Sequence, residues 1–137
     1  MMDQSTIVEL LRSVPLFSSL SDHDLTQVAD RMKEVHFSEG TAVAKQGETG
    51  VGFHLVVDGI AQVSKNGVTL TELGRGGYFG EIGLIDGGPR SATVTATTEL
   101  NTVSLVGWDF TPLLDNPSFT KGLLMGLCRI ARQERGE

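Results

Sequence analysis

The sequence predicts a mainly β fold with flanking helices, in which short antiparallel strands form a sandwich or jelly roll. Between residues 35 and 106, apolar residues recur with a period of two, and turn-forming residues separate the short segments. The stretches before and after this region have the apolar spacing of helices. The 137 residues suit one domain with one core, and 17 glycines agree with many tight turns. We therefore expect a single domain, with helices over 1–34, strands over 35–106 and helices over 107–137.

Two helices are expected before the strands. Apolar residues at helical spacing predict the first over residues 3–12, and Pro15 follows it as an interruption. Ser21 is a good N-cap for the second, with Asp24 three residues later where a capping box has Glu or Gln. This second helix is expected to run to about Lys33.

The middle of the chain contains about eight expected strands. Alternation and turn signals predict strands over 34–37, 42–45, 52–57, 60–65, 68–73 and 100–106, and the β-branched stretch 91–97 predicts another. Asp58-Gly59 and Asn66-Gly67 are hairpin signals, because type I′ turns need positive φ.

Helices return after the last strand. Residues 108–114 are expected to form a short helix that Asn116-Pro117 ends. Pro117 suits the first turn of a final helix that runs to the end of the chain. Its expected apolar stripe consists of Phe119, Leu123, Leu124, Leu127 and Ile130.

The stretch 80–94, GEIGLIDGGPRSATV, contains the residues with the most specific chemistry. Gly80 lets a ligand approach the backbone closely, and Glu81 begins about one expected helical turn. Arg90 suits a phosphate because its planar group donates two parallel hydrogen bonds, and Ser91 adds a hydroxyl beside it. Glu81 only accepts hydrogen bonds, so it suits a sugar hydroxyl. A ribose that carries a phosphate satisfies both residues; the alternative is an ordinary ion pair between Glu81 and Arg90.

The segments Phe79-Gly80-Glu81-Ile82 and Pro89-Arg90-Ser91-Ala92-Thr93-Val94 resemble the phosphate-binding cassette of the cyclic nucleotide-binding domain family. The resemblance implies an eight-stranded antiparallel β jelly-roll barrel, with N-terminal helices and C-terminal B and C helices. It also implies that Glu81 holds the ribose 2′-hydroxyl. Arg90 and Ser91 would hold the cyclic phosphate together with backbone N–H groups of the cassette at residues 79–94, where Gly80, Ile82 and Ala92 are the further candidates.

The base is expected to rest on apolar side chains of the barrel. Alternation makes Val63 and Leu70 candidate wall residues, although both suit the core equally well. Arg132 or Arg135 in the last helix could stack on the purine, or could simply be solvated. Gly122 and Gly126 weaken that helix, which agrees with a helix that moves, but close packing explains them equally well.

Several classes of function are disfavoured. The net charge of −6 argues against nucleic acid as a direct partner of the whole surface. One cysteine, Cys128, excludes an intramolecular disulfide. The acidic N-terminal start and the lack of a long apolar run predict a cytoplasmic protein without a membrane segment. His23, His36 and His54 lie on different segments, so a metal-binding jelly roll is not expected. No catalytic site is expected, because the serines lack a nucleophile elbow or a partnered histidine and no second carboxylate is paired with Glu81.

The expected function is a cyclic nucleotide sensor rather than an enzyme. It would bind cyclic AMP or cyclic GMP, without a further cofactor, and relay binding by movement of the C-terminal helix. The partner would be an effector protein or an effector domain that is not in this chain. The alternative is an interaction module that has the same fold but binds no ligand.

Overall fold

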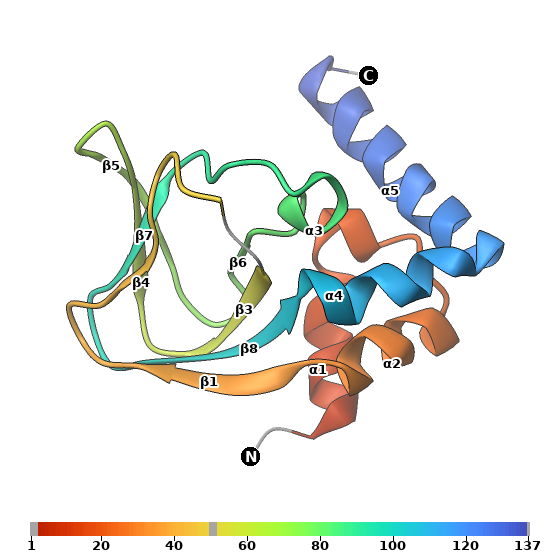
Figure 1. Ribbon diagram of the computed structural model, residues 1–137, viewed down its shortest axis with the longest axis horizontal. Coiled ribbons are helices and arrows are strands. Elements are labelled where there is room, and N and C mark those ends of the chain that lie inside the picture. The colour runs from red at the N-terminus through yellow and green to blue at the C-terminus, as the bar shows by residue number, and fades with distance from the viewer. Residues whose placement is uncertain (1–2, 50–51, 137) are drawn as a thin grey trace. The chain divides into compact units, whose positions relative to one another are not determined.

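The computed structural model describes residues 3–49 and 52–136, which fall into two compact units (Figure 1). One unit is helical and comprises Met1–Met32 with Trp108–Glu137. The other spans Lys33–Gly107 and contains every strand found in the described residues.

The β unit contains two antiparallel sheets of four strands each, which confirms the predicted fold class (Figure 1). The first has the order β1 (Lys33–Phe37), β8 (Leu100–Val106), β3 (Gly52–Asp58) and β6 (Tyr78–Phe79). The second has the order β2 (Ala42–Ala44), β7 (Thr93–Ala96), β4 (Ala61–Lys65) and β5 (Val68–Leu73). Within the described ranges no strand pair joins the two sheets, so the barrel is open.

Small and branched apolar residues fill the space between the two sheets. Val56 and Leu100 come from the first sheet, and both are fully buried. Alanines dominate the contribution of the second sheet, which consists of Ala44, Ala61, Val94 and Ala96. Burial of these side chains removes apolar surface from water and holds the sheets face to face.

Only one of the two expected hairpin turns is a hairpin. Asn66 and Gly67 have φ of 53° and 80°, and they join β4 to β5 as predicted. The prediction for Asp58-Gly59 is wrong, because β3 and β4 belong to different sheets. Gly59 instead carries the chain across between the sheets with a φ of 92°. A Cβ there would lie 2.2 Å from the backbone oxygen of Glu99, so this crossing needs a glycine.

Side-chain caps begin the first helices of the helical unit. Asp3 caps α1 (Gln4–Arg12), since its carboxylate accepts from the Thr6 N–H at 2.9 Å. A short 3₁₀ helix, η1 (Pro15–Phe17), follows. Ser21 caps α2 (Asp22–Asp30) by accepting from the Asp24 N–H at 3.1 Å, as expected. The helix α2 ends before Lys33, because the chain enters β1 at that residue.

The chain re-enters helical structure through α4 (Gly107–Phe110) and η2 (Thr111–Asp115) and ends in α5 (Pro117–Glu134). The Asn116 side chain caps α5 by accepting from the Ser118 N–H at 2.9 Å. Phe119 and Leu123 are buried as expected, but Leu124 is 57% exposed. Across residues 3–49 and 52–136, no helix has both the length and the apolar composition that a bilayer crossing requires.

The two glycines of α5 are explained by close packing. A Cβ on Gly126 would lie 2.3 Å from the backbone oxygen of Leu16, which belongs to η1. A Cβ on Gly122 would lie 2.7 Å from a methyl group of Leu20. Glycines one helical turn apart therefore let the backbone of α5 approach the segment around η1.

Candidate ligand-binding site

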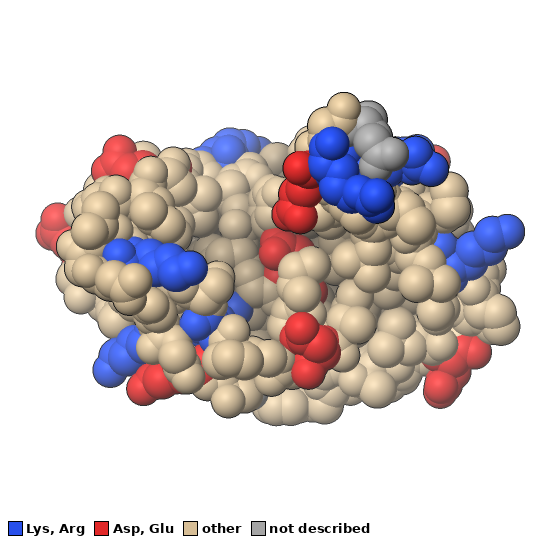
Figure 2. Space-filling view, turned by 90° about the horizontal axis from the view of Figure 1, so that it is seen from above, with Lys and Arg blue, Asp and Glu red and all other residues tan. Residues whose placement is uncertain are grey.

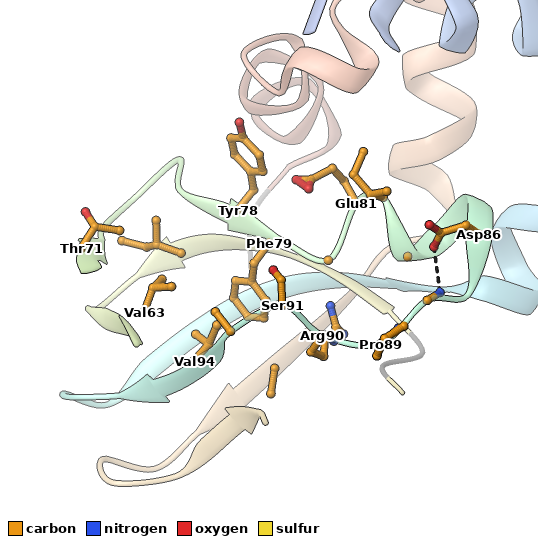
Figure 3. A pocket seen from close by; sticks show the side chains of 17 residues that line it. Val63, Thr71, Tyr78, Phe79, Glu81, Asp86, Pro89, Arg90, Ser91 and Val94 are labelled. Carbon is orange, nitrogen blue, oxygen red and sulfur yellow. Dashed lines mark hydrogen bonds between the residues drawn. The ribbon is translucent and has the colours of Figure 1, made fainter. Parts of the chain in front are cut away.

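A cavity of about 570 Å³ lies within the β unit, and all of its lining residues belong to that unit. Side chains of β4, β5, β6 and β7 line one part of it, and residues 80–92 line the other. In Figure 3, Val63 and Thr71 lie at one end and Asp86 and Pro89 at the other, with Ser91 and Arg90 between them.

The cavity's polar part begins at β6, which consists of two residues. There Phe79 pairs with His54 of β3. The chain then passes through Gly80 and Glu81 into the single-turn helix α3 (Gly83–Asp86). This turn was expected to begin at Glu81; in the structure Ile82 occupies its N-cap position, so the turn begins at Gly83.

The end of this segment is fixed by Asp86. Its carboxylate accepts a hydrogen bond from the Gly88 N–H at 2.8 Å (Figure 3). Asp86 therefore stabilises the glycine-rich turn.

Arg90 is held by both its backbone and its side chain. Its N–H donates to the backbone oxygen of Glu48 at 2.8 Å, and its own oxygen accepts from the Gly47 N–H at 2.9 Å. Its Nη2 donates to the backbone oxygen of Gly52 at 2.6 Å. The start of β3 and the segment before it therefore orient the guanidinium.

Gly80 leaves room for this arginine. Its φ is 86°, and a Cβ would lie 2.1 Å from Arg90 Nη1 and 2.3 Å from the Gly52 oxygen. A side chain at this position would therefore displace the guanidinium from Gly52. The need for glycine comes first from Arg90 rather than from a ligand.

Glu81 and Arg90 line the same cavity, yet each has a buried polar atom without a hydrogen-bond partner. These atoms are Oε2 of Glu81 and Nε of Arg90. No ion pair joins the two side chains, although both lie in the described part of the chain. Buried polar groups without partners are costly and are uncommon in folded proteins. The arrangement therefore differs from the ordinary ion pair considered as the alternative.

The pKa values of both groups reflect this burial. Burial raises the pKa of the Glu81 carboxyl, while the N–H groups of Ile82 and Glu81 and the charge of Arg90 act in the opposite direction. Burial lowers the pKa of Arg90, and the Glu81 charge opposes that shift. The charges of the Glu81 carboxylate and of the Arg90 guanidinium are therefore poorly compensated by the protein alone.

The structure brings most of the predicted site residues together. Gly80, Glu81, Arg90 and Val63 line the cavity, and so do the remaining cassette candidates Ile82, Ser91 and Ala92. Leu70 does not line it and is 58% exposed, because the strand register changes at this residue.

Four lining residues outside residues 79–94 were not anticipated from the sequence. They are Ala44, Thr71, Leu73 and Tyr78. Simple alternation could not place Thr71 and Leu73, because the β4–β5 register shifts between them and the hairpin turn. Tyr78 directly precedes Phe79, where the match to the cassette begins, and this position was the one feature of the sequence that placed it near the cavity.

Arg132 and Arg135 belong to the helical unit. Arg132 lies in the last turn of α5, Arg135 forms its C-cap, and both are exposed. Their stacking on a purine stays a prediction.

His54 lies beside the guanidinium of Arg90. Both residues line a second cavity of about 290 Å³ in the β unit. The imidazole stacks on Phe79 with ring centroids 5.0 Å apart, and its Nδ1 lies 3.1 Å from the Thr102 hydroxyl oxygen. Burial, and secondarily the charge of Arg90, lowers the pKa of His54 to about 4. His54 is therefore a neutral, packed residue at neutral pH.

Comparison with known proteins identifies relatives that are similar to this chain in sequence. A family model described as the cyclic nucleotide-binding domain matches residues 34–116. The cAMP-dependent protein kinase regulatory subunit of Eremothecium gossypii is 41% identical over 107 residues, covering 77% of this chain and 23% of the relative. The regulatory subunit of Schizosaccharomyces pombe is 41% identical over 111 residues, covering 78% and 26%. The chain thus spans about a quarter of the length of these relatives.

Solved structures agree with this result. The N-terminal domain of a transcriptional regulator from Streptomyces coelicolor A3(2) has a TM-score of 0.82 at 30% identity, covering 91% of this chain and 94% of that one. A cAMP-bound structure of a protein named PfPKA-R has a TM-score of 0.68 at 26% identity, covering 93% of this chain and 47% of that one. The family model covers more than half of the chain, and the strands, the cassette and the cavity lie within or beside the matched residues. The chain therefore belongs to the cyclic nucleotide-binding domain family.

Proposed function

We propose that the cavity binds a 3′,5′-cyclic nucleotide, cyclic AMP or cyclic GMP, and that the domain regulates an effector in response. The observation that carries the proposal is the pair of buried, unpartnered atoms, Glu81 Oε2 and Arg90 Nε, in one cavity. A ligand with a hydroxyl donor and an anionic acceptor at the right separation would give each group a partner.

The chemistry of the residues assigns the parts of the ligand. Arg90 and the Ser91 hydroxyl suit the cyclic phosphate, because charge-assisted bonds to phosphate are strong. Glu81 suits the ribose 2′-hydroxyl. Backbone groups at Gly80, Ile82 and Ala92 would complete this part of the site. The base would then occupy the part of the cavity lined by the strands.

The relatives support a regulatory role rather than catalysis. Those quoted are regulatory subunits of a cAMP-dependent kinase, and one similar structure contains bound cAMP. The effector of this chain could be a separate protein or another domain. On the face shown in Figure 2, basic side chains gather at the upper right and are otherwise scattered among acidic and other residues. The net charge of −6 does not favour direct nucleic acid binding by the surface as a whole.

The alternative is an interaction module that has the fold but no ligand. It leaves the two unpartnered atoms unexplained. Calorimetric titration of nucleotide-free protein with cyclic AMP and with cyclic GMP separates the two. We expect saturable binding of at least one nucleotide, with 5′-AMP as the control for the cyclic phosphate. Absence of binding to both cyclic nucleotides at millimolar concentration would exclude the sensor function.

The relay is proposed to use the C-terminal helix. A sheet is locked by its strand pairing, whereas a terminal helix can be displaced at the cost of its apolar contacts alone. Hydrogen exchange with and without cyclic AMP tests this relay. We expect protection to increase in residues 118–135 and in residues 80–91 together. Identical exchange of the helix in both states, with unchanged affinity after deletion of residues 131–137, would contradict it.

A further inference from the structure

The β4–β5 hairpin contributes several side chains to the cavity, but little apolar burial holds it in place. Its lining residues are Val63, Thr71 and Leu73. β5 lies at the edge of its sheet, next to β4 (Figure 1). Five of the six residues of β5 are exposed, and none is buried. Elements with few buried apolar contacts open easily in solution. A further contact that holds the hairpin would therefore keep its wall residues in place.

Gln46 supplies such a contact at the hairpin turn. Its Nε2 donates to Oδ1 of Asn66 at 2.9 Å, and its Oε1 accepts from the Asn66 N–H at 2.8 Å. These two hydrogen bonds are called the Gln46–Asn66 bridge, and both have ordinary lengths. The backbone N–H of Gln46 donates to the Thr93 hydroxyl at 3.0 Å, which fixes the start of the side chain. The bridge therefore holds the turn in both position and orientation.

The bridge lies just beyond the point where the strand pairing ends. β4 pairs with β7 as far as Ser64 and Thr93, and Asn66 lies two residues farther along the hairpin. β2 flanks β7 on the side opposite to β4. The Gln46 side chain therefore reaches past the start of β7, and it joins the segment after β2 to the hairpin turn.

The turn that contains Gln46 also holds Arg90. The Glu48 N–H donates to the Lys45 oxygen at 3.1 Å, which closes a turn over residues 45–48. In this turn, the Gly47 N–H and the Glu48 oxygen bond to the backbone of Arg90. Gln46 does not itself line the cavity. Any effect of its side chain on a ligand must therefore act through the position of the hairpin or of Arg90.

We propose that Gln46 is a positioning residue that fixes the β4–β5 hairpin, and with it one wall of the cavity, relative to Arg90. The inference rests on the proposed function. A ligand that extends from Arg90 to the hairpin needs both in place. Loss of the bridge should therefore weaken ligands that reach the hairpin and spare ligands that occupy the Arg90 end alone.

The test compares cyclic AMP with ribose 3′,5′-cyclic phosphate, which lacks the base and does not reach the hairpin. Gln46→Ala removes both hydrogen bonds of the bridge. We expect it to weaken cyclic AMP binding about threefold to tenfold by calorimetry, as for loss of exposed hydrogen bonds. Its affinity for the ligand without a base should not change. In the ligand-free protein, amide hydrogen exchange should become faster in residues 61–73 and stay the same in β3 and β8.

Two further variants serve as controls. Gln46→Glu should keep most of the cyclic AMP affinity, because the Asn66 amide can rotate and donate to a carboxylate while its N–H keeps an acceptor. Gln62→Ala is the matched control. It changes the same residue type on the same hairpin, but Gln62 does not line the cavity and is not part of the bridge. It should therefore bind both ligands normally.

Three outcomes would overturn the inference. An equal loss for both ligands in Gln46→Ala would show that Gln46 supports the Arg90 end or the fold as a whole. Unchanged exchange of residues 61–73 in that variant would show that the bridge does not hold the hairpin. Failure of the wild type to bind cyclic AMP and cyclic GMP overturns the proposed function itself, and the inference falls with it even where the exchange changes as expected.

Discussion

The two ends of the cavity are constructed in different ways. The end that we propose for the phosphate, called the phosphate end, is lined from one segment, 79–92, whose arginine is fixed by hydrogen bonds to Glu48 and Gly52. The end that we propose for the base, called the base end, combines side chains of separate strands, and its composition depends on strand register and on one bulge, at Leu70. The residues of the phosphate end are therefore close together in the chain, and hydrogen bonds hold its arginine in place.

The largest expected effect at the phosphate end comes from Arg90. Arg90→Ala should weaken cyclic AMP binding by about 2–4 kcal/mol, because the bound phosphate loses its charged partner. Arg90→Lys should recover only part of the loss, since an ammonium group cannot reproduce the planar, two-bond contact. Calorimetry measures both affinities, and thermal melting confirms that each variant is folded. If Arg90→Ala binds cyclic AMP with wild-type affinity, the assignment of the phosphate to this end of the cavity is wrong.

The second test concerns His54, which supports Phe79 and Arg90 from within the β unit. Its folded pKa of about 4 lies below the ordinary value of 6.5. Its contribution to stability is therefore complete above about pH 6.5 and is lost as the pH falls toward 4. The loss should reach about 3 kcal/mol in the free energy of unfolding.

Urea unfolding at pH 7 and at pH 4 measures this loss, and His54→Phe should reduce it. The matched control is His36→Gln, which removes an exposed histidine. The pKa of His36 is raised by its hydrogen bonds to Asn101 and Glu99, so its contribution has the opposite dependence on pH. An unchanged pH dependence in His54→Phe would show that His54 is not a buried neutral group.

A smaller effect is expected for the ribose contact of Glu81. Wild-type protein should bind 2′-deoxy cyclic AMP about 1.5–2 kcal/mol more weakly than cyclic AMP, because the deoxy ligand leaves the carboxylate without its partner. In Glu81→Gln the difference between the two ligands should be smaller. Titration of both proteins with both ligands measures the coupling free energy between the Glu81 carboxylate and the ribose 2′-hydroxyl. Equal affinity of the wild type for the two ligands would exclude this role.

The smallest effect belongs to the base end. Val63→Ala should weaken cyclic AMP binding by about 0.5–1 kcal/mol through lost apolar contact. Leu70→Ala is the matched control, because Leu70 is exposed and does not line the cavity, and it should bind normally. If Leu70→Ala loses more cyclic AMP affinity than Val63→Ala, then Leu70 contacts the ligand and the bulge does not exclude it from the cavity wall.

The same difference between the two ends explains what the sequence could predict. The strands, the helix cap at Ser21, the hairpin turn at Asn66-Gly67 and the grouping of Glu81 with Arg90 depend on neighbours close in the chain. Three features depend instead on how backbone segments meet in the folded structure. These are the sheet crossing at Gly59, the bulge at Leu70 and the close approach of Gly80 to Arg90. No local pattern encodes which sheet a strand joins or which residue a register skips.

The contact of Gly126 with Leu16 restricts how the last helix can be displaced. A screw motion of α5 by one residue, about 1.5 Å along its axis with a rotation of about 100°, would bring a residue with a side chain against the Leu16 carbonyl. Gly122, one turn earlier, faces a methyl group of the Leu20 side chain, which moves aside more easily than backbone. Such a motion is therefore opposed at Gly126, so α5 is displaced either by separating from the segment 15–20 or together with it. In the second case, a displacement of the C-terminal helix would also move residues near the N-terminus of the chain.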